Sequence, residues 1–124
     1  MNSLIIGVSG GVDSAVSSTL AAKTGLKTIV VSMPIYQGED QLKRANQHID
    51  WLRNNYENVE SNEIDLTNLF DKFSELFSKQ SGHALANTRS RLRMVTLYHI
   101  ASLNNGLVVG TGNKVEDFGI GFYT

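Results

Sequence analysis

The sequence predicts an α/β fold in which a doubly wound parallel sheet has helices on both faces. Short apolar runs alternate with stretches of helical periodicity, and this alternation occurs four times along the chain. The clearest apolar runs lack interleaved polar residues, which is typical of strands that are covered on both faces. Crossovers between parallel strands are right-handed, so the intervening helices are expected to form two layers.

The first quarter of the chain supplies two strands and the helix between them. The strands are predicted over Ser3 to Val8 and Lys27 to Ser32, and the second is rich in β-branched residues. The helix is predicted over Asp13 to Lys23, with Gly25 ending it in a left-handed conformation. Met33 to Gly38, which holds the only proline, is expected to be a loop.

Two further helices flank a weaker third strand. The first is expected over Glu39 to Asn54, because apolar residues recur there at helical spacing. These residues are Leu42, Ala45, Ile49 and Leu52. The strand is expected over Asn58 to Ile64, where alternation is loose, and Asp65 or Thr67 can start the next helix, which runs to Gln80. The apolar face of that helix consists of Leu66, Leu69, Phe70, Phe73, Leu76 and Phe77.

The last third of the chain is expected to hold one long helix and the fourth strand. Ser81 to Ala86 is predicted to be a loop, followed by a helix over Asn87 to Asn104 with Gly106 as its stop. The fourth strand is predicted over Leu107 to Gly110, before a glycine-rich tail that runs to Thr124.

Length and composition restrict the class of protein. The chain has 124 residues, which suits one compact domain. A formal charge of −1 gives no electrostatic reason to expect binding along a nucleic-acid backbone. The absence of cysteine excludes disulfides and a cysteine nucleophile carried on this chain. No apolar stretch approaches the roughly 20 residues of a membrane helix, and no basic region precedes the first apolar run, so we expect a cytoplasmic protein without membrane contact.

A ligand site is expected where the first strand passes into the first helix. Small residues at Ser9, Gly10 and Gly11 allow a sharp turn and leave several backbone N–H groups open to a ligand. The helix that starts near Asp13 adds the positive end of its dipole, so a phosphate is the expected ligand. The Asp13 carboxylate repels a phosphate unless a cation lies between them, and Mg²⁺ takes oxygen ligands from both.

Two other loops are expected at the same edge of the sheet. Ligands of such folds bind beyond the carboxyl ends of the strands, where Ser9 to Val12, Met33 to Gly38 and Thr111 to Asp117 are expected to converge. The first of these loops lacks the lysine of the common ATPase loop and the glycine spacing of dinucleotide folds. Another class of phosphate site is therefore indicated.

The motif SGGVDS resembles the pyrophosphate loop of the N-type ATP pyrophosphatases, which cleave ATP between its α and β phosphates and transfer AMP to an oxygen. Two later motifs, NTRSRLRM and GTGNKVEDFGIGFYT, together with the loop resemble the NAD synthetase family from Leu4 to Thr124. The resemblance implies an adenine nucleotide alpha hydrolase-like, Rossmann-like fold. It implies a single ATP pyrophosphatase-type domain over residues 1–124, incomplete at both ends.

The resemblance also implies roles for particular residues. Asp13 and Glu116 would ligate Mg²⁺, and Arg91 would contact deamido-NAD. No residue of the chain is expected to act as a nucleophile. The expected ATP contacts are Gly7, Val8, Ser9, Gly10, Gly11, Val12, Asp13, Ser14 and Thr111.

The implied reaction amidates deamido-NAD. Its nicotinate carboxylate attacks the α-phosphorus of ATP, pyrophosphate leaves into the glycine loop, and ammonia displaces AMP from the adenylate. We expect a homodimer for two reasons. The family resemblance implies one, and the predicted long helix carries apolar residues on more than one face. The sequence leaves the source of the ammonia open between free ammonia and delivery by an external glutaminase.

Two alternative functions stay open at this level. One is another ATP pyrophosphatase, such as a tRNA-modifying sulfur transferase, although that class would be expected to carry cysteines and a basic face for RNA. The other is a non-catalytic nucleotide-binding module. The sequence assigns no role to Arg89, Arg93, Lys114 or the histidines, and Ser32 stands where many family members have an arginine, which leaves the contacts to adenine unassigned.

Overall fold

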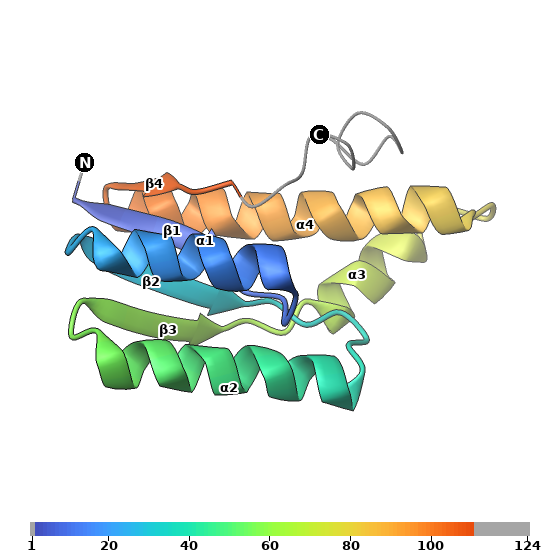
Figure 1. Cartoon of the computed structure of the whole chain (residues 1–124). Helices are drawn as coiled ribbons and strands as arrows, with labels where there is room; N and C mark the ends of the chain where they lie inside the picture. Colours follow the sequence, from blue (N-terminus) through green and yellow to red (C-terminus); the bar gives the residue numbers. More distant parts are fainter. Residues whose placement is uncertain (1, 111–124) are drawn as a thin grey trace.

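The computed structural model describes residues 2–110 and shows a four-stranded parallel sheet between two layers of helices (Figure 1). The strand order is β3-β2-β1-β4. This confirms the predicted fold class. The elements in chain order are β1 (Ser3–Gly7), α1 (Val12–Lys23), β2 (Lys27–Ser32), α2 (Glu39–Asn55), β3 (Val59–Glu63), α3 (Thr67–Ser74), α4 (Gly82–Leu103) and β4 (Gly106–Val108).

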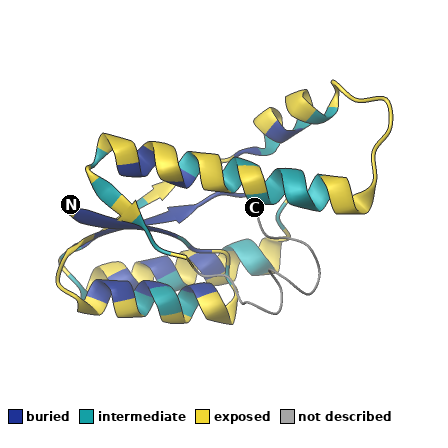
Figure 2. Cartoon of the chain, turned by 90° about the horizontal axis from the view of Figure 1, so that it is seen from above, coloured by how far each residue is buried: buried dark blue, intermediate teal, exposed yellow. Residues whose placement is uncertain are grey.

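Each face of the sheet has its own apolar core. Helices α1 and α2 cover one face, and α3 and α4 cover the other, as the view from above shows (Figure 2). Neighbouring residues of β1 therefore point into different cores, with Ile5 toward α4 and Ile6 toward α1 and α2. Burial on both faces explains why the middle residues of the first two strands, Leu4 to Ile6 and Ile29 to Val31, are uninterrupted apolar runs.

The core between the sheet and α1 and α2 contains Ile6, Val8, Ala22, Val30, Ala45, Ile49, Leu52 and Val59. The core under α3 and α4 contains Ile5, Ile29, Val31, Met33, Ile35, Leu66, Phe70, Leu97, Ile100 and Ala101.

The end of α1 matches its prediction, whereas α3 is shorter than predicted. Gly25 has a φ of +80° and directly follows the C-cap residue of α1, as its left-handed role requires. Helix α3 ends at Ser74 instead of Gln80, and the Gln80 side-chain amide donates a hydrogen bond to the Ser74 carbonyl at 2.6 Å. The prediction of one continuous apolar face is wrong, because only Leu66 and Phe70 of this set reach the core. Its other four members, Leu69, Phe73, Leu76 and Phe77, are exposed.

Helix α4 starts earlier than predicted. It begins at Gly82, so the expected loop over Ser81 to Ala86 is wrong. The Ser81 hydroxyl oxygen accepts a hydrogen bond from the Ala84 N–H at 3.1 Å, which caps the helix. The serine cap outweighs the weak helix propensity of the glycine behind it.

The fourth strand also differs from its prediction. It spans Gly106–Val108 instead of Leu107 to Gly110, and Asn105, with a φ of 49°, takes the left-handed conformation at the end of α4. A Cβ on Gly106 would lie 2.5 Å from Ser3 Oγ and 3.1 Å from the Ser3 carbonyl oxygen. Gly106 therefore serves the close approach of β4 to β1 and does not act as a helix stop.

Two helices on the same face are joined by a buried serine. Ser18 Oγ of α1 lies 2.9 Å from His48 Nε2 of α2, and the His48 ring stacks on Trp51 with a centroid distance of 5.9 Å. Burial lowers the pKa of His48, and a hydrogen bond with the backbone of Ala15 opposes part of that effect. The fold therefore favours the neutral imidazole.

We expect the stability of the protein to fall in acid because of His48. The unfolded chain, in which histidine has a pKa of about 6.5, takes up the proton more readily than the folded chain. The stabilising contribution is present above that pH and is lost as the pH falls through the lowered pKa of the folded state. Urea denaturation at several pH values between about 8 and 5 measures the effect.

His48→Gln should reduce the slope of unfolding free energy against pH in this range. His99→Gln, at an exposed histidine of α4, is the matched control and should leave the slope near that of the wild type. An unchanged slope in His48→Gln would contradict the assignment.

Candidate nucleotide site

The glycine loop, residues 8–11, joins β1 to α1 at the carboxyl edge of the sheet. Gly10 has a φ of +91°, and a Cβ at this position would lie 2.5 Å from the Gln41 carbonyl oxygen of α2. The loop therefore needs glycine here both for its backbone conformation and for its contact with α2. The predicted sharp turn is present.

Two serine hydroxyls fix the shape of the glycine loop. Ser14 Oγ accepts a hydrogen bond from the Ser9 N–H at 3.1 Å and lies 3.2 Å from both Ser9 Oγ and the Gly11 carbonyl oxygen. The Gly11 N–H donates to Ser9 Oγ at 3.3 Å. Ser14 is buried, so this network ties the loop to the first turn of α1.

The N-terminal end of α1 has N–H groups without an internal acceptor. Within residues 2–110, the backbone N–H groups of Gly10, Val12, Asp13 and Ser14 make no hydrogen bond, and the first helical bond runs from Ala15 to Gly11 at 3.2 Å. Such donors at the positive end of a helix dipole suit an anion with several oxygens. The loop thus offers several unpaired donors at the place where the sequence predicts a phosphate.

Asp13 brings a carboxylate to the same turn. Its side chain is exposed in the first turn of α1 and forms no ion pair with another residue in the described part of the chain. One carboxylate together with phosphate oxygens and water is a usual donor set for Mg²⁺. No group of three acidic or histidine side chains that could hold a metal occurs within residues 2–110. Glu116, the second predicted ligand, lies outside the described residues.

The other predicted ATP contacts differ in their surroundings. Gly7 belongs to β1, where a Cβ would lie 3.1 Å from the Met33 side chain, and Val8 is buried with its N–H bonded to the Val31 carbonyl at 2.8 Å. These two residues hold the glycine loop on the sheet. The Val12 side chain is 78% exposed, so a contact from Val12 would come from its backbone. Thr111 lies outside the described residues.

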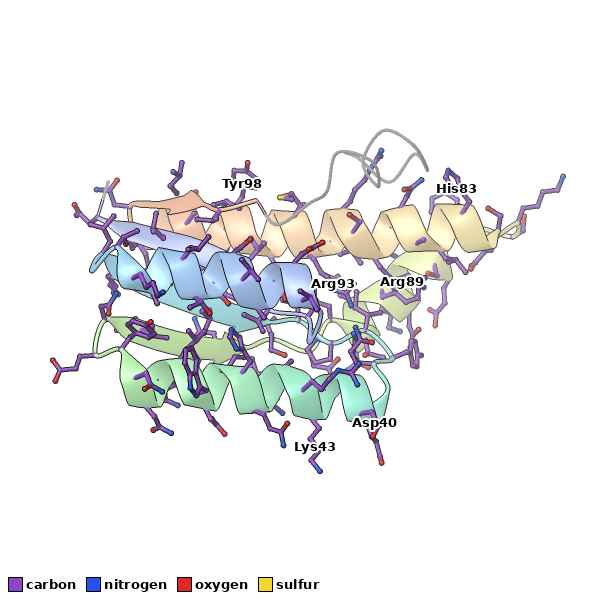
Figure 3. All side chains as sticks on the ribbon, viewed as in Figure 1. Asp40, Lys43, His83, Arg89, Arg93 and Tyr98 are labelled. Carbon is purple, nitrogen blue, oxygen red and sulfur yellow. The ribbon has the colours of Figure 1, made fainter. Side chains whose placement is uncertain are left out.

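The loop after β2, residues 33–38, is held by Arg93, to which the sequence assigns no role. Arg93 Nε donates to the Met33 carbonyl at 3.0 Å, and Nη2 donates to Gln37 Oε1 at 3.1 Å. Burial, and then the nearby charge of Arg89, lower the pKa of Arg93 from its usual high value. The i, i+4 spacing that puts Arg89 and Arg93 on one face of α4 was the available signal (Figure 3).

An aromatic cluster lies beside this loop. Tyr36 has a φ of 51°, and its hydroxyl donates to Asp71 Oδ2 at 2.5 Å, which raises the pKa of Tyr36. The Phe70 ring meets Tyr36 edge-on at 6.4 Å, and the Arg89 guanidinium carbon lies 5.5 Å from the centre of that ring. Helices α3 and α4 therefore both hold the loop after β2.

Arg91, the predicted contact to deamido-NAD, is exposed and hydrogen-bonds no other residue within 2–110.

Comparison with known proteins identifies the family. The family model described as NAD synthase matches residues 1–124. The chain belongs to the NAD synthase family. It is 34% identical over 122 residues to the NH(3)-dependent NAD(+) synthetase of Thermoplasma volcanium, and the match covers 97% of this chain and 48% of that protein. The chain therefore spans about half the length of the curated relatives that it matches.

Solved structures agree with this assignment. The NH3-dependent NAD synthetase of Campylobacter jejuni superposes with a TM-score of 0.81 at 31% identity, covering 93% of this chain and 49% of that one. The NMN synthetase of Francisella tularensis superposes with a TM-score of 0.82 at 33% identity, covering 93% of this chain and 47% of that one.

None of the helices between residues 2 and 110 combines the length and the apolar character that a membrane-spanning segment requires.

We expect Gly10→Ala to destabilise the protein and displace the glycine loop. The substitution forces a left-handed alanine and places its Cβ against the Gln41 carbonyl, which should cost about 1–3 kcal/mol. Gly82→Ala is the matched control, because nothing lies within 4 Å of its added Cβ, and it should be neutral or stabilising. Urea denaturation measures both effects, and equal stabilities of the two variants would contradict the strain at Gly10.

Proposed function

We propose that this chain is the nucleotide-binding part of an ammonia-dependent NAD synthetase, a ligase that forms the C–N bond of NAD from deamido-NAD, ATP and ammonia. The observation that supports the proposal is the set of free N–H donors in the SGGVDS loop at the start of α1. In a chain of this family, these donors suit the phosphates of ATP.

The reaction needs positioning and charge neutralisation more than a protein nucleophile. The carboxylate of deamido-NAD attacks the α-phosphorus, and the bond between that phosphorus and the bridging oxygen breaks, so its electron pair leaves with pyrophosphate. The N–H groups of the glycine loop bind the departing pyrophosphate oxygens. Ammonia then attacks the carbonyl carbon of the adenylate, loses a proton, and AMP leaves. No cysteine is required at any step.

The remaining parts of the proposed site follow from the family roles. Asp13, with Glu116, would hold Mg²⁺, which neutralises phosphate charge when bound. Arg91 would bind deamido-NAD, and Gly7, Val8 and Thr111 would complete the ATP contacts.

We infer that the synthetase acts as a cytoplasmic homodimer. The outward side of α4 supports a dimer, because Val95 and Tyr98 are 67% and 58% exposed and Figure 3 shows Tyr98 pointing away from the sheet. Ammonia would come from solution or from an external glutaminase, since this chain holds no cysteine for hydrolysing glutamine.

A mononucleotide is a second candidate for the acceptor of the AMP group. The Francisella tularensis structure at 33% identity is described as an NMN synthetase, so relatives of this chain include a protein named for a mononucleotide product. The corresponding acceptor would be nicotinate mononucleotide. It offers the same carboxylate and lacks the adenylyl half of deamido-NAD.

The activity can be tested with the purified chain. MgATP and ammonium are incubated with either deamido-NAD or nicotinate mononucleotide, and AMP, NAD and NMN are measured by chromatography. We expect AMP and NAD in equal amounts with deamido-NAD, and neither product when ATP is replaced by ADP. Product from the mononucleotide alone would favour the second acceptor. MgATP binding without any product would contradict synthetase activity in this chain and support the non-catalytic nucleotide-binding module.

Asp13→Asn should weaken binding of ATP mainly when Mg²⁺ is present. Loss of the carboxylate removes a metal ligand but leaves the backbone donors in place, so we expect an affinity loss of about tenfold or more for MgATP and little change in EDTA. Isothermal titration calorimetry measures both affinities. Asp50→Asn, at an exposed carboxylate of α2, is the control. Equal losses with and without Mg²⁺ would argue against a metal role for Asp13.

A further inference from the structure

Helix α2 forms one wall of the glycine loop. The Gln41 carbonyl oxygen and the Ala45 backbone nitrogen would lie 2.5 Å and 3.4 Å from a Cβ on Gly10. Arg44, from the same turns of α2, donates a hydrogen bond from Nε to the Gly10 carbonyl oxygen at 3.4 Å. A cationic side chain is therefore held directly against the loop.

The Arg44 guanidinium has unused binding capacity. It carries five N–H donors, and within residues 2–110 only the Nε donor has a partner. No carboxylate of the described residues lies within 4.0 Å of it to form an ion pair. Figure 3 shows Asp40 and Lys43 on the outer side of α2, pointing away from α1. Arg44 is exposed, so its remaining donors are open to a ligand.

Arg44 contacts the same loop that carries the unpaired N–H donors. Gly10 accepts from Arg44 through its carbonyl oxygen, while its own N–H is one of the donors without a partner. The guanidinium thus contacts the carbonyl of a residue whose own N–H has no partner within residues 2–110. A guanidinium binds phosphate oxygens through two parallel N–H bonds, and its charge offsets that of the phosphate.

We propose that Arg44 is a further phosphate-binding residue, whose guanidinium binds the oxygens of the β-phosphate and γ-phosphate of ATP and then those of pyrophosphate. The proposal rests on the proposed function, because it needs a nucleotide in the glycine loop. As the bond to the α-phosphorus breaks, the β-phosphate gains negative charge beside Arg44. A cation at that position stabilises the transition state more than it stabilises bound ATP.

The test compares ligands that differ in the β-phosphate. Binding of MgATP, Mg-pyrophosphate and AMP to the full chain is measured by isothermal titration calorimetry for wild type, Arg44→Gln, Arg44→Lys and the control Arg53→Gln, at the far end of α2. We expect Arg44→Gln to lose about tenfold or more in affinity for ATP and pyrophosphate but less than about twofold for AMP. Arg44→Lys should recover part of the loss, and Arg53→Gln should match wild type.

Three other results would contradict the proposed role of Arg44. Wild-type affinity of Arg44→Gln for pyrophosphate would overturn the proposal. Equal losses for AMP and pyrophosphate would also overturn it, because Arg44 would then only shape the loop through the Gly10 carbonyl. A wild-type chain that binds neither ATP nor pyrophosphate would overturn the proposed function and this inference together. If Arg44→Gln does not fold, as judged by circular dichroism, the same comparison is made with Arg44→Lys, which must then differ from wild type for the β-phosphate ligands alone.

Discussion

The backbone N–H groups at the start of α1 lack an acceptor within residues 2–110, and the rest of the site is arranged around them. The conformation that leaves them open depends on Gly10, which is left-handed and in contact with the Gln41 carbonyl of α2. Ser9 and Ser14 use their hydroxyls to hold the turn, so the N–H groups stay available for a ligand. A fixed array of donors needs little rearrangement when charge develops on a bound phosphate.

The two helix layers contribute differently to this edge of the sheet. On one face, α2 packs against the glycine loop and brings Arg44 to it. On the other face, α4 uses Arg93 to hold the loop after β2 through the Met33 carbonyl. The sheet fixes the distance between these loops because β1 and β2 are paired along their length. The site is thus built from elements that lie on opposite sides of the sheet, each held by packing in its own core.

The sequence predicts the bounds of an element well where the composition of the element itself determines them. The bounds of β2 agree with the prediction, since six consecutive residues from Lys27 to Ser32 carry a strong β signal. The start of α4 and the length of α3 are wrong, because they depend on a capping hydroxyl at Ser81 and on how far the core extends beyond Phe70. Periodicity alone contains neither fact.

The residues of the candidate site also divide into those that local sequence predicts and those that it does not. The glycine loop can be predicted because backbone conformation and helix ends leave a mark on nearby residues. Arg44 and Arg93 cannot, since their partners Gly10 and Met33 lie 34 and 60 residues away in sequence. The i, i+4 spacing places Arg89 and Arg93 on one face of α4, but it does not reveal which loop an arginine will contact. The roles of Arg91, Thr111 and Glu116 stay predictions, as they rest on the family motif.

The pairing of β1 with β4 has a consequence for how the chain folds. Ser3 Oγ donates to the Asn104 carbonyl across a sequence separation of 101 residues, and Gly106 closes onto the same serine. During synthesis, β1 and β2 can pair through α1 long before β4 leaves the ribosome, whereas the outer strand must wait. Closing so long a loop carries an entropic cost, so the β1–β4 edge is expected to be the last part of the sheet to form.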